Sequence, residues 1–109
     1  MSVSDDYLQY ILERLQCVGN VTSKRMFGGV GIYSANIFFA LIDDNTLYFK
    51  VDNANRNDYE DVGMQPFRPY GEKSYAMAYY TVPEEVLEND QSLTVWAKKA
   101  IAVARKKAK

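Results

Sequence analysis

Hydrophobic positions near the N-terminus recur at helical spacing. The apolar stripe is formed by Leu8, Ile11, Leu12 and Leu15. Spacings of three and four residues are typical of a helix that buries one face. Ser4 precedes the stripe as a candidate N-cap, and acidic residues follow it in the first turn, where they favour the helix dipole. Because the pattern ends before Gly19, we predict a helix over Asp5–Gln16.

The hydrophobic period changes after Val21. Short β-branched and aromatic runs follow, at Val30 and Ile32, at Ile37–Ile42 and at Leu47–Val51. Polar breaks separate them at Ser34–Asn36 and Asp43–Asn45, where the asparagines are best suited to a positive φ. We predict three antiparallel strands joined by two hairpins. The middle strand is apolar on both faces, which favours a central position with its second face also covered.

Shorter elements are predicted in the second half of the chain. A polar helix over Asn55–Val62, capped by Asp52 or Asn53, is expected to end at Gly63 in the left-handed conformation. Since this segment carries few apolar residues, we expect a connector rather than a core helix.

Proline and aromatic residues predict the elements that follow. Pro66 and Pro69 bracket Phe67, which suits a short edge strand because proline cannot donate to an inner ladder. Alternation over Ser74–Thr81 predicts a clearer strand, and Pro83–Glu88 predicts one helical turn.

The last helix is predicted to begin near Asp90. Its apolar face is formed by Leu93, Trp96, Ala97, Ala100, Ile101 and Ala104. The resulting order, α-β-β-β-α-β-β-α, predicts an α+β fold with one antiparallel sheet and helices packed on a face. A chain of 109 residues fits one two-layer domain over residues 1–109.

Composition excludes much catalytic chemistry. The chain has no histidine, which removes Ser-His and Cys-His pairs and His-ligated zinc. Cys17 is the single cysteine, and with no signal-peptide pattern this indicates a reducing cytoplasm. No apolar run approaches the roughly 20 residues that span a bilayer. We therefore expect a soluble, cytoplasmic protein with no membrane partner.

Three features invite a chemical interpretation and none supports it strongly. The glycine cluster Met26–Gly31 is followed by neither Gly-Lys-Ser/Thr nor a helix, so a bulge or a close backbone approach is favoured over phosphate binding. Cys17 has no histidine to activate it and is interpreted as a small packed or semi-exposed residue at the helix end. Acidic pairs such as Asp43 and Asp44 suit turns and lack calcium-loop spacing. We predict no catalytic residue, metal or cofactor.

The C-terminal helix carries the clearest electrostatic signal. The last twelve residues hold nearly half of the 13 Lys and Arg residues and no acid, whereas the rest of the chain is acidic. We interpret these cations as a solvated helix end that complements the helix dipole. The alternative is weakly specific DNA binding through Lys98, Lys99, Arg105, Lys106 and Lys107. Few cations are interleaved with the aromatic residues, which favours core packing and a protein interface over base stacking.

Six segments together resemble the N-terminal domain of the TfoX/Sxy competence regulators of bacteria. They are Met26–Tyr33 (Met-Phe-Gly-Gly-Val-Gly-Ile-Tyr), Phe39–Ile42, Leu47–Lys50, Gly63–Phe67, Met77–Tyr80 and Trp96–Ala97. The resemblance runs over nearly the whole chain. It implies an α+β fold similar to that of secretion chaperones, whose members often pair as dimers.

The resemblance also implies a role. Full-length regulators are thought to switch on competence genes alongside the cyclic-AMP receptor protein, as coactivators rather than enzymes, and no catalytic residues carry over. Those regulators typically add a helical C-terminal domain, whereas this chain stops at Lys109. On this expectation a stand-alone domain keeps the binding surface, while its part in competence stays open.

We therefore predict a non-enzymatic interaction module whose partner is a protein, either a transcription factor or a second copy of the chain. The predicted contact surface is the family motif, formed by Met26, Phe27, Gly28, Gly29, Gly31 and Tyr33, with neighbouring aromatics. A small-ligand or enzymatic site among the tyrosine-rich strands is a further alternative.

Overall fold

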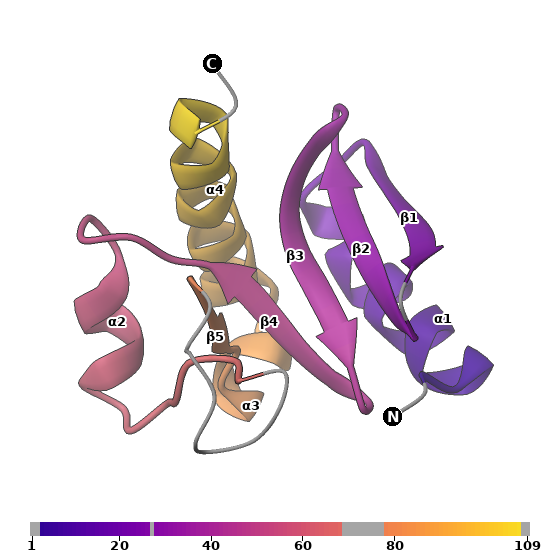
Figure 1. Cartoon of the computed structure of the whole chain (residues 1–109), viewed down its shortest axis with the longest axis horizontal. Coiled ribbons are helices and arrows are strands. Elements are labelled where there is room, and N and C mark those ends of the chain that lie inside the picture. Colours follow the sequence, from indigo (N-terminus) through magenta and orange to yellow (C-terminus); the bar gives the residue numbers. More distant parts are fainter. Residues whose placement is uncertain (1–2, 27, 69–77, 108–109) are drawn as a thin grey trace.

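The computed structural model describes residues 3–26, 28–68 and 78–107. The elements in chain order are α1 (Asp5–Arg14), a 3-10 turn (Leu15–Cys17), β1 (Val21–Met26), β2 (Gly29–Ser34), β3 (Ile37–Asp43), β4 (Thr46–Lys50), α2 (Arg56–Glu60), β5 (Tyr79–Thr81), α3 (Glu84–Leu87) and α4 (Asp90–Lys107). Figure 1 shows their arrangement. The predicted α+β class is confirmed.

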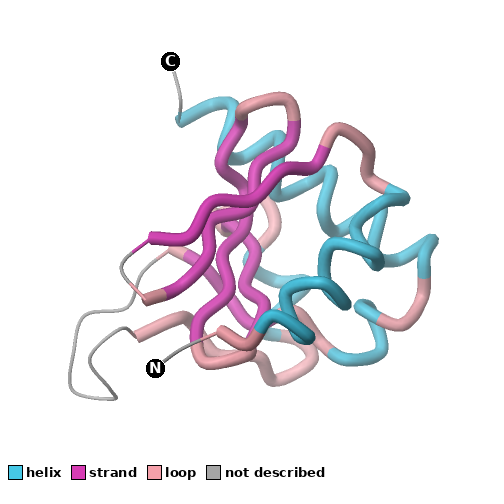
Figure 2. The backbone as a smooth tube through the Cα atoms, turned by 90° about the vertical axis from the view of Figure 1, so that its right-hand side faces the viewer, coloured by secondary structure: helices cyan, strands magenta, loops and turns pink. Residues whose placement is uncertain are grey.

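Within the described residues, the sheet has five antiparallel strands in the order β1-β2-β3-β4-β5. The prediction of a central apolar strand is confirmed, because β3 lies in the middle. The helices gather on one side of the sheet (Figure 2). In the described ranges no helix lies on the other side of the sheet. The second face of β3 was predicted to be covered, and among these residues no helix provides that cover.

Helix α1 begins where its N-cap predicts. The Ser4 Oγ accepts a hydrogen bond from the Tyr7 amide at 3.1 Å, and the Ser4 amide donates to the Asn45 Oδ1 at 2.9 Å. The second bond ties the helix start to the β3–β4 turn. The helix predicted to end at Gln16 is confirmed as far as Arg14. After Arg14 the chain continues as a 3-10 turn, which is wound more tightly than an α-helix.

The predicted number of strands before α2 was wrong, because four described strands precede this helix where three were predicted. The additional strand is β1, which pairs with β2 along its whole length. Its four inner residues, Thr22–Arg25, are all exposed, so no alternation of apolar and polar residues marks it. Backbone pairing at the sheet edge requires no such alternation, and the sequence pattern therefore missed it.

The two-residue turns inside the sheet explain the polar breaks. Ala35 and Asn36 have φ values of 48° and 69°, and Asp44 and Asn45 have 51° and 53°. Positive φ at both central residues is the backbone of a type I′ hairpin, whose twist matches that of the strands. The prediction for the two asparagines is confirmed.

Helix α2 differs from its prediction in length and in role. It begins at Arg56, and the Asp52 carboxylate accepts from the Ala54 amide before the helix instead of capping it. Gly63, with φ of 80°, ends the segment in the left-handed conformation as predicted. Tyr59 is 1% exposed and belongs to the core, so α2 is more than a connector.

The remaining elements follow the predictions closely. Pro66 makes a single bridge to Tyr80 at the far edge of β5, where an edge strand was expected. Of the predicted strand over Ser74–Thr81, residues 74–77 lie outside the described residues. Helix α3 forms the predicted turn, and α4 begins at Asp90 as expected.

The core lies between the sheet and the helices. Tyr59 packs there between two aromatic rings, with its ring centroid 4.6 Å from that of Trp96 and 5.8 Å from that of Tyr80. Its hydroxyl is buried and has no hydrogen-bond partner among the residues that the structure describes. The ring contacts stabilise the folded state, whereas burying an unpaired hydroxyl destabilises it.

Replacing Gly29 is expected to destabilise the fold more than replacing Gly31. A Cβ at Gly29 would lie 2.7 Å from the Ile42 carbonyl oxygen, which cannot move without disturbing the ladder. A Cβ at Gly31 would meet the flexible end of Met26 at 2.8 Å. Gly29→Ala should lower the free energy of unfolding by about 1–3 kcal/mol, with a smaller loss for Gly31→Ala. Urea unfolding measures both, and losses in the reverse order would contradict the assignment.

Removing the Tyr59 hydroxyl is expected to stabilise the protein. Tyr59→Phe keeps both ring contacts and removes the unpaired hydroxyl, which should raise the free energy of unfolding by about 1–3 kcal/mol. Thermal and urea unfolding measure the change. Tyr59→Leu is the control, because it loses the ring contacts as well and should destabilise. A stability loss in Tyr59→Phe would mean that the hydroxyl has a partner in solution.

Candidate functional site

The face of the sheet opposite the helices carries the candidate site. Val30, Ile32 and Ser34 of β2 are buried toward the helices, so the alternating residues Gly29, Gly31 and Tyr33 lie on the other face. Residues paired across an antiparallel ladder share a face. The surface that we call the aromatic face therefore comprises Met26, Gly29, Gly31, Tyr33, Phe38, Leu41, Tyr48 and Tyr79 from the strands, with Phe67 packed on it.

Aromatic rings contact one another across this face. The ring of Phe38 lies 5.2 Å from that of Tyr33, in a stacked arrangement, and 5.9 Å from that of Tyr79. The Lys50 ammonium lies 4.8 Å from the centre of the Tyr79 ring, within cation–π distance. The neighbouring pair, Tyr48 and Phe67, has ring centroids 4.8 Å apart. The face thus combines apolar rings with hydroxyls and a cation.

Gly31 allows these side chains to close over β2. A Cβ at this position would lie 2.8 Å from the Met26 Cε, 3.2 Å from the Phe38 Cε1 and 3.4 Å from the Tyr33 Cε1. The space that a larger residue would take is therefore filled by three neighbours. Gly29 instead brings the backbones of β2 and β3 together, which confirms the predicted close approach and explains the glycine cluster without phosphate.

Burial raises the pKa of several tyrosines. Desolvation raises the pKa of Tyr79 to about 12, and the nearby Tyr33 adds to the effect. Burial, followed by the carboxylates of Asp43 and Asp44, raises the pKa of Tyr48. The hydroxyls of Tyr79 and Tyr48 therefore stay protonated near neutral pH, where they can exchange hydrogen bonds but do not supply a general base.

The structure brings together most of the predicted family motif. Met26, Gly29, Gly31 and Tyr33 all lie on the aromatic face. Gly28, with φ of 80°, belongs to the tight β1–β2 turn, and Phe27 lies outside the described residues.

The prediction named neighbouring aromatics without identifying them. Phe38, Tyr48, Phe67 and Tyr79 are those residues, and they lie far from the motif in sequence. In the sequence, the only indication of these residues was their alternate positions within the β-branched and aromatic runs, which is typical of side chains on one face of a strand. Register across the sheet was needed to show that they meet.

The cations of α4 are partly neutralised within the molecule. The Lys99 Nζ lies 2.9 Å from the Asp58 Oδ2, and the Lys106 Nζ lies 3.4 Å from the Asp52 Oδ2. Lys98 and Arg105 are exposed and have no ion-pair partner among the described residues, while the Lys107 side chain lies outside them. The five candidate DNA contacts therefore do not form one unpaired basic surface.

Other candidate features lie away from the aromatic face. Cys17 is exposed and free at the end of the 3-10 turn. Within the described part of the chain, no cluster of three or more acidic or cysteine residues is arranged to hold a metal ion. None of the helices in residues 3–26, 28–68 and 78–107 has the length and apolarity to cross a membrane.

Alkaline pH is expected to destabilise the protein through Tyr79. Its pKa is about 12 in the folded state and about 10 when unfolded, so between these values the unfolded chain loses its proton first. The stabilisation is complete below pH 10 and is lost as pH rises through 12, by at most about 3 kcal/mol. Tyr79→Phe should reduce this fall in urea unfolding between pH 9 and 12. The exposed Tyr10→Phe is the control, and equal effects of the two variants would contradict the prediction.

Comparison with known proteins identifies the family. The profile described as the TfoX N-terminal domain matches residues 13–104, from within α1 to within α4. A comparison with curated proteins found no match. The matched region includes all five strands and therefore the strand residues of the aromatic face. The chain belongs to the TfoX N-terminal domain family.

Proposed function

We propose that this chain is a non-enzymatic protein-interaction module that takes part in the transcriptional regulation of competence-type genes, and that the aromatic face is its contact surface. The observation that carries the proposal is the row of contacting rings Tyr33, Phe38 and Tyr79 on the face of the sheet that no described helix covers. Tyrosine and phenylalanine are enriched at protein interfaces, because they combine a large apolar area with few rotatable bonds.

The form of the surface favours a protein partner over a small molecule. Its residues come from five neighbouring strands, β1–β5, and extend across the whole width of the described sheet. Raised tyrosine pKa values leave the hydroxyls available for hydrogen bonds at the rim of an interface. The resemblance to competence regulators, which implies a coactivator role, favours a transcription factor as that partner. A second copy of the chain is the alternative partner.

Direct DNA binding is the less favoured function. Ion pairs with Asp58 and Asp52 occupy Lys99 and Lys106, which leaves Lys98 and Arg105 as the clearest phosphate contacts. Two such contacts would give a log–log salt slope of only about −1.8. Fluorescence anisotropy with a random duplex at about 50 and 200 mM salt measures this slope, and tight binding with a slope near −5 would favour the DNA hypothesis instead.

Changing the aromatic face is expected to abolish the regulatory effect while the fold is retained. Leu41 lies on this face, paired with Gly31 and Tyr48, so Leu41→Arg places a charge amid the rings. Val95 is 52% exposed on α4, and Val95→Arg is the matched control. In cells lacking the chain, transcripts of competence-type genes should fall, and Val95→Arg but not Leu41→Arg should restore them.

Two outcomes would contradict the proposal. Unchanged transcripts in cells lacking the chain would exclude the regulatory role. Full restoration by Leu41→Arg would exclude the aromatic face as the contact surface. Circular dichroism must show that Leu41→Arg folds, and Tyr48→Ser is the second variant if it does not. Light scattering of the purified chain distinguishes a second copy from a different protein as the partner.

A further inference from the structure

The two outer edges of the sheet differ in whether their backbone groups are hydrogen-bonded to another segment of the chain. The β5 edge is occupied, because the Phe67 amide donates to the Tyr79 carbonyl at 2.7 Å and the Thr81 amide donates to the Gln65 carbonyl at 3.3 Å. The β1 edge carries no such segment, since none of the described residues pairs with its outer side. Edge strands present unpaired N–H and C=O groups that another chain can use.

The register identifies which backbone groups of β1 face outward. The Ala35 amide donates to the Asn20 carbonyl at 3.1 Å, so Asn20 and Ala35 form a hydrogen-bonded pair. In an antiparallel ladder such pairs alternate with non-hydrogen-bonded pairs. The N–H and C=O groups of Val21, Ser23 and Arg25 therefore point away from β2. Their regular spacing matches the backbone of one added strand.

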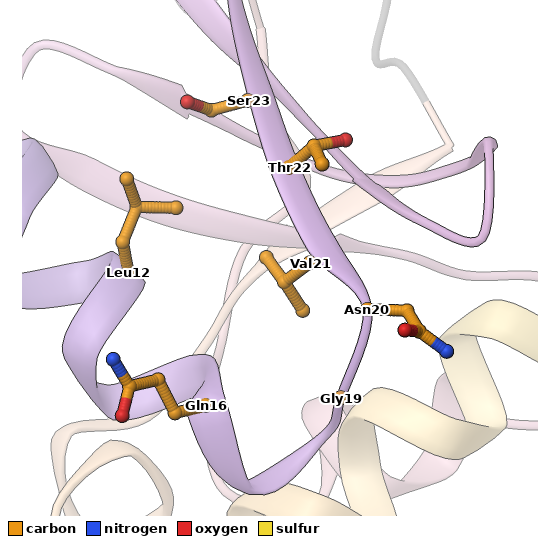
Figure 3. A pocket seen from close by; sticks show the side chains of 7 residues that line it. All are labelled: Leu12, Gln16, Gly19, Asn20, Val21, Thr22 and Ser23. Carbon is orange, nitrogen blue, oxygen red and sulfur yellow. The ribbon is translucent and has the colours of Figure 1, made fainter.

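A hollow lies beside this edge, between β1 and the end of α1. Figure 3 shows the side chains of Val21 and Ser23 on the strand directed toward α1, which carries Leu12, and toward the 3-10 turn, which carries Gln16. The hollow has a volume of about 580 Å³ and is lined further by Gly19, Asn20 and Thr22. Leu12 and Val21 provide an apolar wall, while the Gln16 amide and the Ser23 hydroxyl make no side-chain hydrogen bond with a described residue. An added strand would direct alternate side chains into this space.

The charge of the edge selects the partner. Lys24 is exposed and has no ion-pair partner among the described residues, and its side chain lies on the opposite face of β1 from the hollow. Arg25 already binds Asp5, with 2.7 Å between the Nη2 and the Oδ1, and the Val3 carbonyl. Lys24 is therefore the cation free to meet an incoming carboxylate.

We propose that the outer edge of β1 binds an extended acidic peptide of a partner protein as a sixth strand. An apolar side chain of the peptide enters the hollow between Leu12 and Val21, and the next residue along the peptide, an acid, meets Lys24. This is strand addition beside a helix, in which backbone bonds give affinity and alternate side chains give specificity. The strand edge and the hollow lie apart from the aromatic rings, whereas Lys24, which pairs with Gly31, lies on the same side of the sheet as those rings. The proposal does not depend on the function proposed for the aromatic face.

A second copy of the chain fits this edge less well. Pairing β1 with another β1 would gather Lys24 and Arg25 from both copies on two adjacent strands, where like charges repel. Lysine on an exposed edge is a common means of preventing association between identical sheets. The same charge that opposes self-pairing attracts an acidic strand.

Titration of the isotope-labelled full chain with a synthetic peptide tests the proposal. The probe is an acetylated, amidated hexapeptide of alternating glutamate and valine, and the control peptide has lysine in place of glutamate. Saturable shifts are expected in the amide signals of Val21, Ser23 and Arg25 with the first peptide only. Lys24→Glu should weaken binding about fivefold or more, whereas Lys98→Glu, which reverses an exposed charge on α4, should not.

Ser23→Pro removes an outward N–H without removing a bond to β2, so it should abolish saturable binding. If this variant does not fold, the Lys24→Glu comparison and the amide shifts decide. The absence of saturable binding, equal binding of the lysine peptide, equal weakening by Lys98→Glu, or self-association through β1 would each overturn the proposal. Tyr48→Ser changes the aromatic face on β4 without adding a charge near Lys24, and it should leave peptide binding unchanged. Failure here is therefore distinguishable from failure of the function proposed for the aromatic face.

Discussion

The packing of α4 against β3 is the contact on which the rest of this fold depends. Ala97 and Ala100 of the helix and Ala40 of the central strand have no exposed surface, and such small side chains let the two backbones approach closely. The same helix extends over β4, and α3 packs against it. Helix α1 then completes the layer through Ile11, which is fully buried. As a result, all the described helices lie on one face of the sheet (Figure 2).

A sheet that is covered by helices on one face must satisfy its other face with its own side chains. In this chain the strands do so with stacked rings and with glycines that let those rings close over the backbone. The rings of this surface are apolar and pack against one another, while the tyrosine hydroxyls can form hydrogen bonds with water. Because the pKa values of Tyr48 and Tyr79 are raised, these hydroxyls stay uncharged. This balance is characteristic of surfaces that proteins use to bind one another, and it links the fold to the proposed function.

Charge and hydrogen bonding are distributed by the same architecture. The loop and helix after β4 bring Asp52 and Asp58 to the cations of α4, so the contrast between an acidic body and a basic end is reduced within the molecule. At the sheet edges, Gln65–Phe67 satisfies β5, whereas β1 keeps its outward groups beside a hollow. The molecule therefore offers two surfaces of different character, an aromatic face and a strand edge.

The sequence alone determined the elements whose stability comes from side-chain periodicity or local backbone chemistry. These are α1, α4, the central strand, the turns at Asn36 and Asn45, and the end at Gly63. It also indicated the family motif, of which Met26, Gly29, Gly31 and Tyr33 lie together. Only the tertiary structure decided the rest. Strand β1 is stabilised by backbone pairing that leaves no hydrophobic pattern, and Tyr59 is buried between Trp96 of α4 and Tyr80 of β5, which are distant from it in sequence. The aromatic face and the β1 edge depend on register and strand order, which are set by contacts between residues distant in sequence and so cannot be inferred from local spacing.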